Sequence, residues 1–213
     1  AKTVDTSVYE RNREAADNEN KYVVRCLNTG KICLFTDGGK MHQVKVPDLP
    51  YGKFRDKGTP IDNVSNYSSA EEQIVMVCDA EQMRFAKLLF ATKQGMIKRV
   101  EGTEFQVAKR TIAATKLQEE DALIGVWVVN EIQHAVLQTK NGYFLRFPAA
   151  DIPEKKKGAV GVRGIRLQKN DELEQVYLFE EGTESKVMYG EKEVTLNRLK
   201  LAKRDGTGTK SRN

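Results

Sequence analysis

Apolar residues along this chain gather in short runs in which they recur with a period near two. Gly, Asp or Asn bounds most of these runs, and such a pattern predicts β-strands separated by turns. The apolar runs occupy residues 32–35, 74–77, 88–91, 123–129, 135–137 and 176–179. The best helical candidates, residues 8–16 and 80–86, are short and weakly amphipathic. The pattern therefore predicts an all-β fold.

A β-hairpin anchored on a Thr-x-x-Gly sequence occurs three times, ending at Gly39, Gly95 and Gly142. In each copy an apolar strand meets a turn whose glycine tolerates positive φ, and a second strand with basic and apolar residues follows. The glycines lie 56 and 47 residues apart, the length of a unit of about four short strands, as in a propeller blade. Behind each hairpin an implied third strand leads to an acidic turn, and that turn opens a fourth strand.

The repeat divides the chain into four blade-like units, at about residues 27–78, 87–130, 134–180 and 185–213. The fourth unit stops before its acidic turn and last strand, whereas residues 18–26 have such a turn and strand with no hairpin before them. Pairing these two ends protects exposed strand edges. Residues 1–213 are therefore expected to form one domain, a propeller-like array of about four four-stranded blades in which the N-terminal strand completes the last blade. Both a closed ring and an open arc fit this repeat.

The composition allows a hydrophobic core, because 39% of the 213 residues are hydrophobic. No run approaches the roughly 20 apolar residues that a membrane span requires, and no charged and then apolar leader opens the chain. We therefore expect a cytoplasmic protein with no membrane partner, and the polar run at residues 10–20 suggests a part of a longer polypeptide. Cys26, Cys33 and Cys78 lie in apolar stretches at no metal or redox spacing and are predicted to be reduced core residues.

The sequence contains no pattern typical of a catalytic or metal-binding centre. His42 and His134 have no Cys, His or carboxylate at ligand spacing, so no metal site is predicted. No nucleophile elbow is present, and acidic residues such as 119–121 recur as the turn of every unit, which indicates a structural role. Residues 206–211 imitate the end of a phosphate-binding loop, but that loop requires a following helix and only two residues remain. No catalytic residue is therefore predicted.

Positive charge is unevenly distributed along the chain. Lys and Arg number 35 against 30 Asp and Glu, and the excess lies in residues 85–213, which contain 23 basic and 17 acidic residues. Basic residues recur at equivalent places of the hairpins and of the loops behind them. The predicted DNA-binding residues are Lys40, Lys45, Lys53, Arg55, Lys57, Lys93, Lys98, Arg99, Lys109, Arg110, Lys140, Arg146, Lys155, Lys156, Lys157, Arg163 and Arg166.

A radial array brings equivalent positions together on one rim, so these residues are expected to form a curved belt of positive charge. Such a belt is typical of a surface that holds the phosphate backbone of double-stranded DNA with little sequence selectivity. Two other interpretations remain, namely charges at ordinary density that only solvate a β surface, and a propeller-type module that binds a peptide. Repetition of the charges at equivalent sites favours DNA.

Two segments are more specific than the rest of the repeat. Residues 90–99 read Phe-Ala-Thr-Lys-Gln-Gly-Met-Ile-Lys-Arg, and residues 158–167 combine three spaced glycines with two arginines before Asp171-Glu172-Leu173. Both resemble the C-terminal DNA-wrapping domain, or β-pinwheel, of the A subunit of bacterial type IIA topoisomerases, and the resemblance covers nearly the whole chain. It implies that each blade gives a strand to its neighbour and that the basic outer rim bends a DNA duplex.

The gyrase box, a heptapeptide of the form QRRGGKG in the first blade, distinguishes gyrase within this family. The corresponding loop in this chain, residues 51–58, is basic but lacks the paired glycines. The resemblance therefore favours topoisomerase IV, with the wrapping domain of gyrase as the alternative. It implies a non-catalytic accessory domain that guides the transported DNA segment during ATP-dependent decatenation or relaxation.

The same resemblance implies the partners of the domain. These are double-stranded DNA, the N-terminal breakage-reunion domain of the same subunit, and an ATPase B subunit in an A2B2 holoenzyme. ATP and Mg are expected on other domains, with no cofactor in this one, and the expected location is cytoplasmic and nucleoid-associated.

Overall fold

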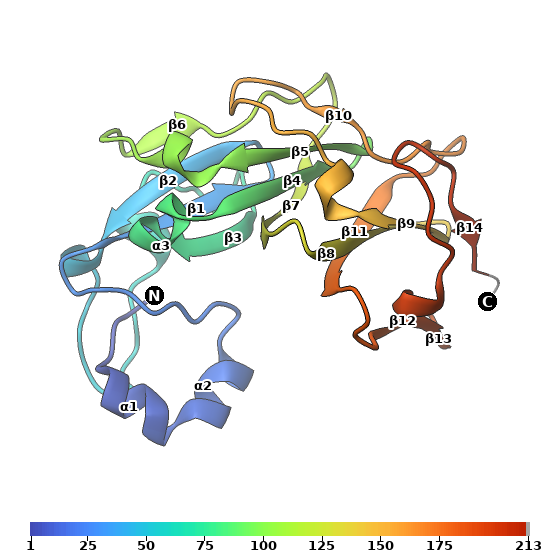
Figure 1. The fold of residues 1–213 in the computed structure, drawn as a ribbon. Coiled ribbons are helices and arrows are strands. Elements are labelled where there is room, and N and C mark those ends of the chain that lie inside the picture. The colour runs from blue at the N-terminus through green and yellow to red at the C-terminus, as the bar shows by residue number, and fades with distance from the viewer. Residues whose placement is uncertain (212–213) are drawn as a thin grey trace.

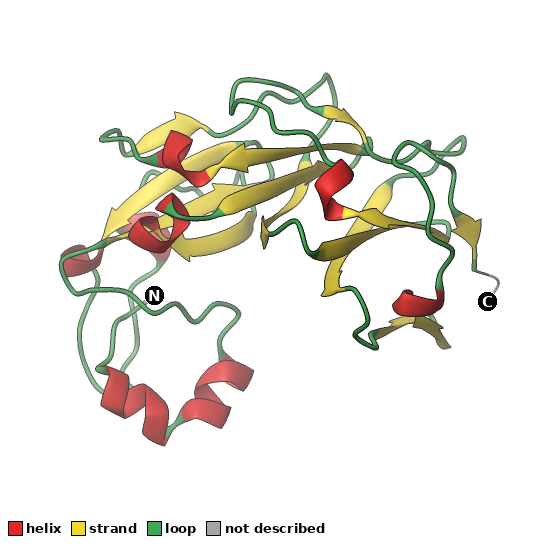
Figure 2. Cartoon of the chain, in the orientation of Figure 1, coloured by secondary structure: helices red, strands yellow, loops and turns green. Residues whose placement is uncertain are grey.

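The computed structural model describes residues 1–211, so residues 212 and 213 at the end of the expected fourth unit lie outside the described residues. Across residues 1–211 the strands form three four-stranded antiparallel sheets and one two-stranded sheet, and the helices are short (Figure 1, Figure 2). Successive sheets follow one another as a fan from the first unit to the last (Figure 1). The predicted all-β array of blade-like units is therefore confirmed.

Each four-stranded sheet runs from an inner edge, where neighbouring sheets meet, to an outer edge. In that order the first sheet contains β3 (Ile74–Asp79), β1 (Lys31–Thr36), β2 (Lys40–Lys45) and β6 (Thr111–Ala113). The second contains β7 (Leu123–Val129), β4 (Lys87–Thr92), β5 (Met96–Glu101) and β10 (Val162–Arg163). The third contains β11 (Leu173–Glu180), β8 (Gln133–Thr139), β9 (Tyr143–Pro148) and β14 (Thr209–Lys210). The fourth sheet pairs β12 (Lys186–Tyr189) with β13 (Lys192–Thr195).

The helices lie outside the sheets. They are α1 (Thr6–Arg11), α2 (Arg13–Glu19), α3 (Ala80–Arg84) and the 3-10 turns η1 (Val46–Asp48), η2 (Ile61–Asn63), η3 (Gly102–Phe105), η4 (Ala149–Asp151) and η5 (Leu196–Arg198). The helical candidate at residues 8–16 is thus two helices divided at Asn12, and the candidate at residues 80–86 is α3. Within residues 1–211, no helix has both the length and the apolar character to cross a membrane.

The outer strand of each four-stranded sheet comes from the following unit. β6 pairs with β2, β10 with β5 and β14 with β9, so the second, third and fourth units each give a strand to the sheet before them. The backbone passes very close to the sheet just before the exchange. Gly161 has φ +99°, and a Cβ there would lie 2.5 Å from the carbonyl oxygen of Ile97, so the position requires glycine. Strand exchange between neighbouring blades, which the resemblance implies, is therefore present.

The N-terminal segment does not complete the last blade, and the expectation for residues 18–26 is wrong. Residues 21–26 form no strand. Val24 and Cys26 instead pack against the apolar cluster of the first sheet, and the Tyr22 hydroxyl donates to the Ile74 carbonyl at 3.2 Å. The adjacent first blade offers apolar surface, whereas the fourth blade lies at the other end of the array (Figure 1). Within the described residues the fourth sheet has two strands and the array is an open arc.

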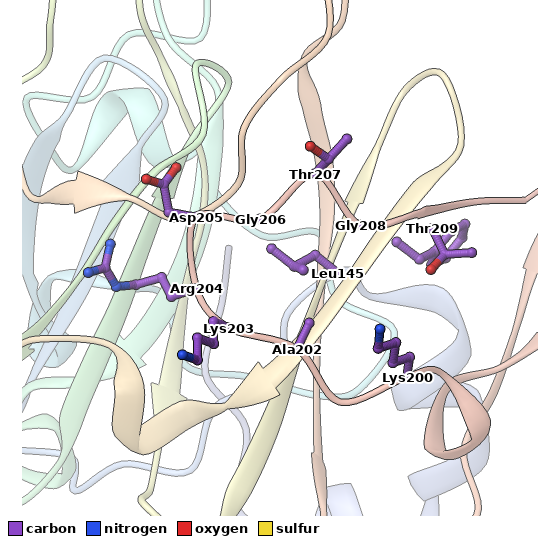
Figure 3. Close-up of a pocket in the computed structure, with 11 residues that line it drawn as sticks. Leu145, Lys200, Ala202, Lys203, Arg204, Asp205, Gly206, Thr207, Gly208 and Thr209 are labelled. Atoms are coloured by element: carbon purple, nitrogen blue, oxygen red, sulfur yellow. The ribbon is translucent and has the colours of Figure 1, made fainter.

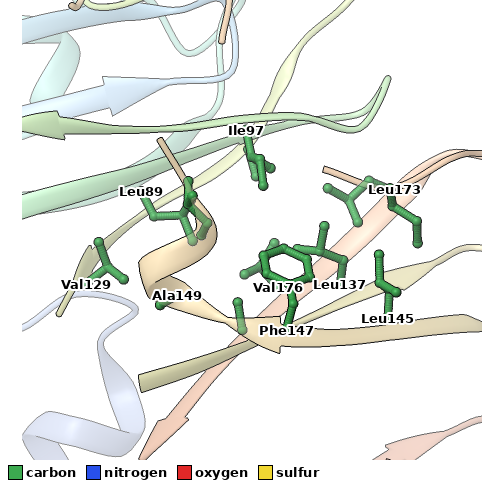
Figure 4. Close-up of a cluster of buried hydrophobic side chains, with 13 residues drawn as sticks. Leu89, Ile97, Val129, Leu137, Leu145, Phe147, Ala149, Leu173 and Val176 are labelled. Carbon is green, nitrogen blue, oxygen red and sulfur yellow. The ribbon is translucent and has the colours of Figure 1, made fainter. Parts of the chain in front are cut away.

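The hydrophobic core lies largely between neighbouring sheets. One cluster joins the second and third sheets, with Leu89, Ile97, Leu137 and Phe147 among its buried side chains (Figure 4). Another joins the first and second sheets around Phe35. The strands at the inner edges are in contact as well, β3 with β7 and β7 with β11. Neighbouring blades therefore share their core, and this fixes their relative orientation.

The three cysteines are free thiols, as the sequence predicts. Cys33 is buried, whereas Cys26 and Cys78 are half-buried. Cys33 on β1 faces Cys78 on β3 across the first sheet. Burial raises the pKa of the Cys26 thiol, which keeps it in the neutral form.

A buried polar network ties β6 to the first sheet. The Thr36 hydroxyl donates to Glu72 Oε1 at 2.8 Å, and His42 Nε2 lies 2.9 Å from Glu72 Oε2. The other ring nitrogen of His42 lies 2.8 Å from the Thr111 hydroxyl oxygen on β6. Burial raises the pKa of the Glu72 carboxyl, but the hydrogen bonds with Thr36 and His42 outweigh that effect and hold the pKa below its usual value.

Replacing Glu72 with Ala should lower the free energy of unfolding by about 1–3 kcal/mol, because buried donors lose their acceptor. The stability that the carboxylate contributes is present above the ordinary pKa of Glu and is lost as pH falls through the lowered pKa of the folded state. Chemical denaturation from about pH 7 to about pH 3 should therefore show a loss of stability that Glu72→Gln reduces. The exposed neighbour supplies the control, Glu71→Gln, and equal effects of the two substitutions would contradict this assignment.

Candidate nucleic-acid interface

Loops lie along the outer edge of the array. Each loop packs on a segment that comes before its own unit in the sequence. Four of them belong to the four units and span residues 51–58, 106–110, 154–161 and 201–208. Three of the four begin with a parallel bridge, which joins Thr3 to Tyr51, Arg99 to Glu154 and Arg146 to Leu201. The first loop is therefore laid over the N-terminal residues, and the other two are laid over β5 and β9.

These three loops share one construction of eight residues. Each ends at a glycine, and a Cβ at Gly58, Gly161 or Gly208 would lie 2.2, 2.5 or 2.6 Å from a carbonyl oxygen of the segment beneath. The last residue of each loop therefore lies directly against the backbone of the segment beneath it. This common construction gives the side chains of the three loops equivalent positions along the arc.

Most of the predicted DNA-binding residues are exposed. The exposed ones are Lys40, Lys45, Lys53, Arg55, Lys57, Lys93, Lys109, Arg110, Lys140, Lys155, Lys156, Arg163 and Arg166. Seven of them lie in the loops at residues 51–58, 106–110 and 154–161, and we call the cations of these loops and of the loop at residues 201–208 the loop row. Lys40, Lys93 and Lys140 instead lie at the hairpin turns, at the ends of the blades. The structure therefore divides most of the expected single belt into a loop row and a hairpin row, and Lys45 at the end of β2, Arg163 in β10 and Arg166 belong to neither.

The hairpin row lies beside the acidic turns. Asp121 Oδ1 accepts a hydrogen bond from the Gln94 N–H at 3.0 Å, and Asp171 Oδ1 accepts one from the Asn141 N–H at 2.9 Å. The acidic turns thus have the structural role that the sequence predicts. In the loops at residues 51–58, 106–110, 154–161 and 201–208, lysines and arginines outnumber the carboxylates of Asp56, Glu154 and Asp205, so the loop row is a favourable surface for an anion.

Lys98, Arg99 and Arg146 do not lie on the exposed rim, which corrects their place in the predicted belt. Lys98 and Arg99 are only 1% and 6% exposed. Arg99 Nε donates to the Ile152 carbonyl at 2.6 Å, and Arg146 Nη1 donates to the Asn197 carbonyl at 2.8 Å. Both guanidinium groups therefore clamp the following unit onto the strand that precedes it.

The fourth residue after the hairpin glycine performs this clamping in three units. In the first unit the residue is Gln43, whose Nε2 donates to the carbonyls of Val107 at 2.8 Å and Lys109 at 2.6 Å. A repeated cation looks the same in the sequence whether it faces solvent or a neighbouring unit. Gln43 occupies the position of Arg99 and Arg146 in the first unit, and this uncharged residue is the sequence feature that indicates a hydrogen-bonding role for the position.

Two further predicted residues are partly engaged within the protein. Arg163 is exposed, but its Nη2 donates to Asp205 Oδ2 at 2.9 Å, and this pairing holds the pKa of Asp205 below its usual value. Lys157 is half-buried, and its backbone N–H donates to Glu104 Oε1 at 3.0 Å. Within residues 1–211, no three His, Cys, Asp or Glu side chains gather as a metal site requires.

The fourth unit adds cations that the sequence analysis missed. Lys200 and Lys203 are exposed and Arg204 is half-buried in or next to the loop at residues 201–208. Lys203 and Arg204 correspond to Lys156 and Lys157, which lie 47 residues earlier, as Gly161 does from Gly208. The hairpin glycines of the second and third units are also 47 residues apart, so adding this spacing to Lys156 and Lys157 would have identified Lys203 and Arg204 from the sequence. This loop also borders a cavity of about 440 Å³ (Figure 3).

A fan of four-stranded sheets linked by strand exchange, with cationic loops along its outer edge, defines the class of β-pinwheel domains. Residues 86–130 and 133–180 match the family described as DNA gyrase C-terminal domain, beta-propeller. The chain belongs to this family of C-terminal domains of type IIA topoisomerase A subunits, as the resemblance indicates.

Relatives with similar sequences are A subunits of gyrase. The DNA gyrase A subunit of Lawsonia intracellularis is 30% identical over 97% of this chain and 27% of its own length. The DNA gyrase A subunit of Deinococcus deserti is 34% identical over 66% of this chain and 18% of its own length. The chain thus spans about a quarter or less of the length of these curated relatives.

Solved structures share the fold at lower sequence identity. A C-terminal domain of DNA topoisomerase IV superposes with a TM-score of 0.82 at 22% identity, over 98% of this chain and 68% of that one. The E. coli ParC C-terminal domain gives a TM-score of 0.73 at 18% identity, over 88% of this chain and 78% of that one. At these identities the comparison shows the fold alone.

Because Arg146 clamps the fourth unit, its replacement should lower the stability of the protein and leave its electrostatic contacts with DNA unchanged. Arg146→Met should lower the free energy of unfolding by about 1.5–3 kcal/mol, because hydrogen bonds from a charged donor are lost. Hydrogen exchange should increase at residues 186–199, and the salt dependence of any DNA binding should stay the same. Lys140→Met, in the same hairpin but exposed, is the control. Unchanged stability with a smaller salt dependence would place Arg146 on the DNA-facing surface instead.

Proposed function

We propose that this chain binds and bends duplex DNA, largely independently of sequence, as a non-catalytic domain of a type IIA topoisomerase A subunit. The observation that carries the proposal is the loop row, in which four loops from four units present lysines and arginines along one outer edge. Family membership supports it, because the gyrase and topoisomerase IV proteins that this chain resembles act on DNA, as their names state.

The physical basis is charge neutralisation along a curved path. Lysine and arginine side chains that replace the counterions of DNA release them, and this gives affinity without base contacts. Bending 20–30 base pairs through 40–90° costs on the order of 1–6 kcal/mol, so contacts in several loops must act together to offset the cost. An open arc with equivalent loops at successive blades distributes such contacts along the bend.

Within the family we propose a topoisomerase IV type of action, in which the domain guides the transported segment during ATP-dependent decatenation or relaxation. The loop at residues 51–58, which corresponds to the gyrase box, lacks the paired glycines. The proposed partners are an ATPase B subunit in an A2B2 holoenzyme and the breakage-reunion domain that precedes this one in the same polypeptide, and a cytoplasmic, nucleoid-associated location follows. The gyrase relatives in sequence support the alternative, a gyrase wrapping domain.

Charge reversal in the loop row should weaken DNA binding at every sequence. Lys155→Glu with Lys156→Glu should reduce the slope of log K against log salt by about 1.8, which at 0.1 M salt corresponds to a loss of about sixtyfold or more. Fluorescence anisotropy with several unrelated duplexes measures both quantities. Lys93→Glu with Lys140→Glu, in the hairpin row, is the matched control and should have the smaller effect.

Two outcomes of this experiment decide against the proposal. Absence of duplex binding by the unmodified chain at low salt excludes DNA as the ligand. Binding that changes little between 50 and 200 mM salt favours a peptide-binding module with apolar anchors, because phosphate contacts are strongly salt-dependent. A ligation experiment then distinguishes the topoisomerase IV type of action from the gyrase type. Nicked circular DNA is ligated with the domain bound, and a large shift in its linking number indicates the wrapping expected of gyrase.

A further inference from the structure

One loop of the loop row closes around a buried ammonium group, that of Lys98 in β5. Lys98 Nζ donates hydrogen bonds to the carbonyls of Lys156 at 3.0 Å, Lys157 at 3.0 Å and Ala159 at 2.6 Å. The ammonium has three N–H donors, so its donors match these three acceptors in number. It also lies 5.4 Å from the centroid of the Phe90 ring. Lys98 therefore forms the interior of the loop and not its surface.

The first loop is built in the same way. Lys2 Nζ donates to the carbonyls of Lys53 at 3.3 Å and Asp56 at 2.7 Å, and it also contacts the carbonyl of Phe54. Counted from the parallel bridge at the start of each loop, both ammonium groups bind the carbonyls at the third, fourth and sixth positions. Two lysines far apart in the sequence thus bind the carbonyls of two cationic loops with one geometry.

The fourth loop shows the same construction without an ammonium. Leu145 takes the place of Lys98, and the carbonyls at the third, fourth and sixth positions belong to Lys203, Arg204 and Gly206. Leu145, Lys203, Arg204 and Gly206 border the cavity of about 440 Å³ that lies there (Figure 3). The backbone of the loop therefore reaches the same end points without an ammonium. Its sixth carbonyl, that of Gly206, accepts a hydrogen bond from the Arg166 N–H at 2.8 Å instead.

We propose that Lys98 is a positioning residue for DNA, whose ammonium holds the loop at residues 154–161 in the shape that presents Lys155 and Lys156 to the phosphate backbone. The inference rests on the proposed function. Three carbonyl dipoles are turned inward onto the ammonium, and the lysine side chains of the loop, which repel one another, are held in one compact turn. Lys2 has the same role for the loop at residues 51–58.

Burying this charge has a cost, which argues that the ammonium is retained for the loop and not for packing. Burial lowers the pKa of Lys98 to about 8, and the carboxylate of Glu104 opposes that shift. An apolar side chain of similar length avoids the cost and still fills the space above Phe90. What it cannot do is bind three carbonyls at once.

A mutant cycle on DNA affinity tests the proposal. The variants are Lys98→Met, the pair Lys155→Met with Lys156→Met, and the triple variant. Lys98→Met should weaken binding and lower the salt slope nearly as much as the pair does, by about 1.8 and about sixtyfold at 0.1 M salt, although Lys98 is buried. The triple variant should be no weaker than the pair, because all three act through one loop. A normal salt slope for Lys98→Met, or additive losses in the triple variant, would overturn the proposal.

Hydrogen exchange distinguishes a loop effect from a failure to fold. In Lys98→Met, faster exchange should be confined to amides 155–161, while β4 and β5 keep their protection. Leu145→Met, at the equivalent position of the next blade, is the matched control and should change neither loop. Loss of protection throughout the second sheet would show that Lys98 supports the blade itself, and would overturn the positioning role.

A gain-of-function variant provides an independent test. Leu145→Lys places an ammonium beneath the fourth loop, and it should slow exchange at amides 203–206 and tighten DNA binding. A folded variant with unchanged exchange would contradict the geometry. If the unmodified chain binds no duplex, the proposed function fails, whereas the exchange measurements on Lys98→Met and Leu145→Lys still decide whether the ammonium organises its loop.

Discussion

Backbone pairing between the third strand of each four-stranded sheet, counted from the inner edge, and a short strand of the next unit is the interaction on which the rest of this structure depends. It joins β6 to β2, β10 to β5 and β14 to β9, and it repeats in the same direction along the arc. The loop before each exchanged strand must therefore pass over the preceding sheet. This places the cationic loops on the outer edge and brings the clamping side chains against the carbonyls of the next unit.

The sequence predicts the repeat and the fold class because both depend on local chemistry. The Thr-x-x-Gly hairpins and the alternating apolar runs are each contained in a few residues, and they identify the sheets that form. The surface against which residues 21–26 pack is not predicted by local chemistry, because an apolar strand-like segment can be covered by any adjacent apolar surface. Val24 and Cys26 pack on the first blade, which is near in sequence and in space, and the acidic turn before them gives no information about that choice.

The candidate site is predicted in part, and the errors have a common cause. Residues in loops, such as Lys155 and Lys156, are exposed as expected, since nothing in the fold covers them. Arg99 and Lys98 lie on β5, which in this fold is covered by the next unit. The exposure of a residue on such a strand depends on a segment more than 50 residues away, as the hydrogen bond from Lys98 to Ala159 illustrates. Periodicity within one unit does not contain that information.

Strand exchange also sets the order in which the molecule is completed during synthesis. The first sheet lacks its outer strand until residues 111–113 have been made, the second until residues 162–163, and the third until residues 209–210. At each stage the newest sheet leaves a row of N–H and C=O groups able to pair with a strand of another chain. A growing chain on the ribosome therefore exposes one unpaired edge that advances by one blade at a time, and a pause between units prolongs the exposure of that edge.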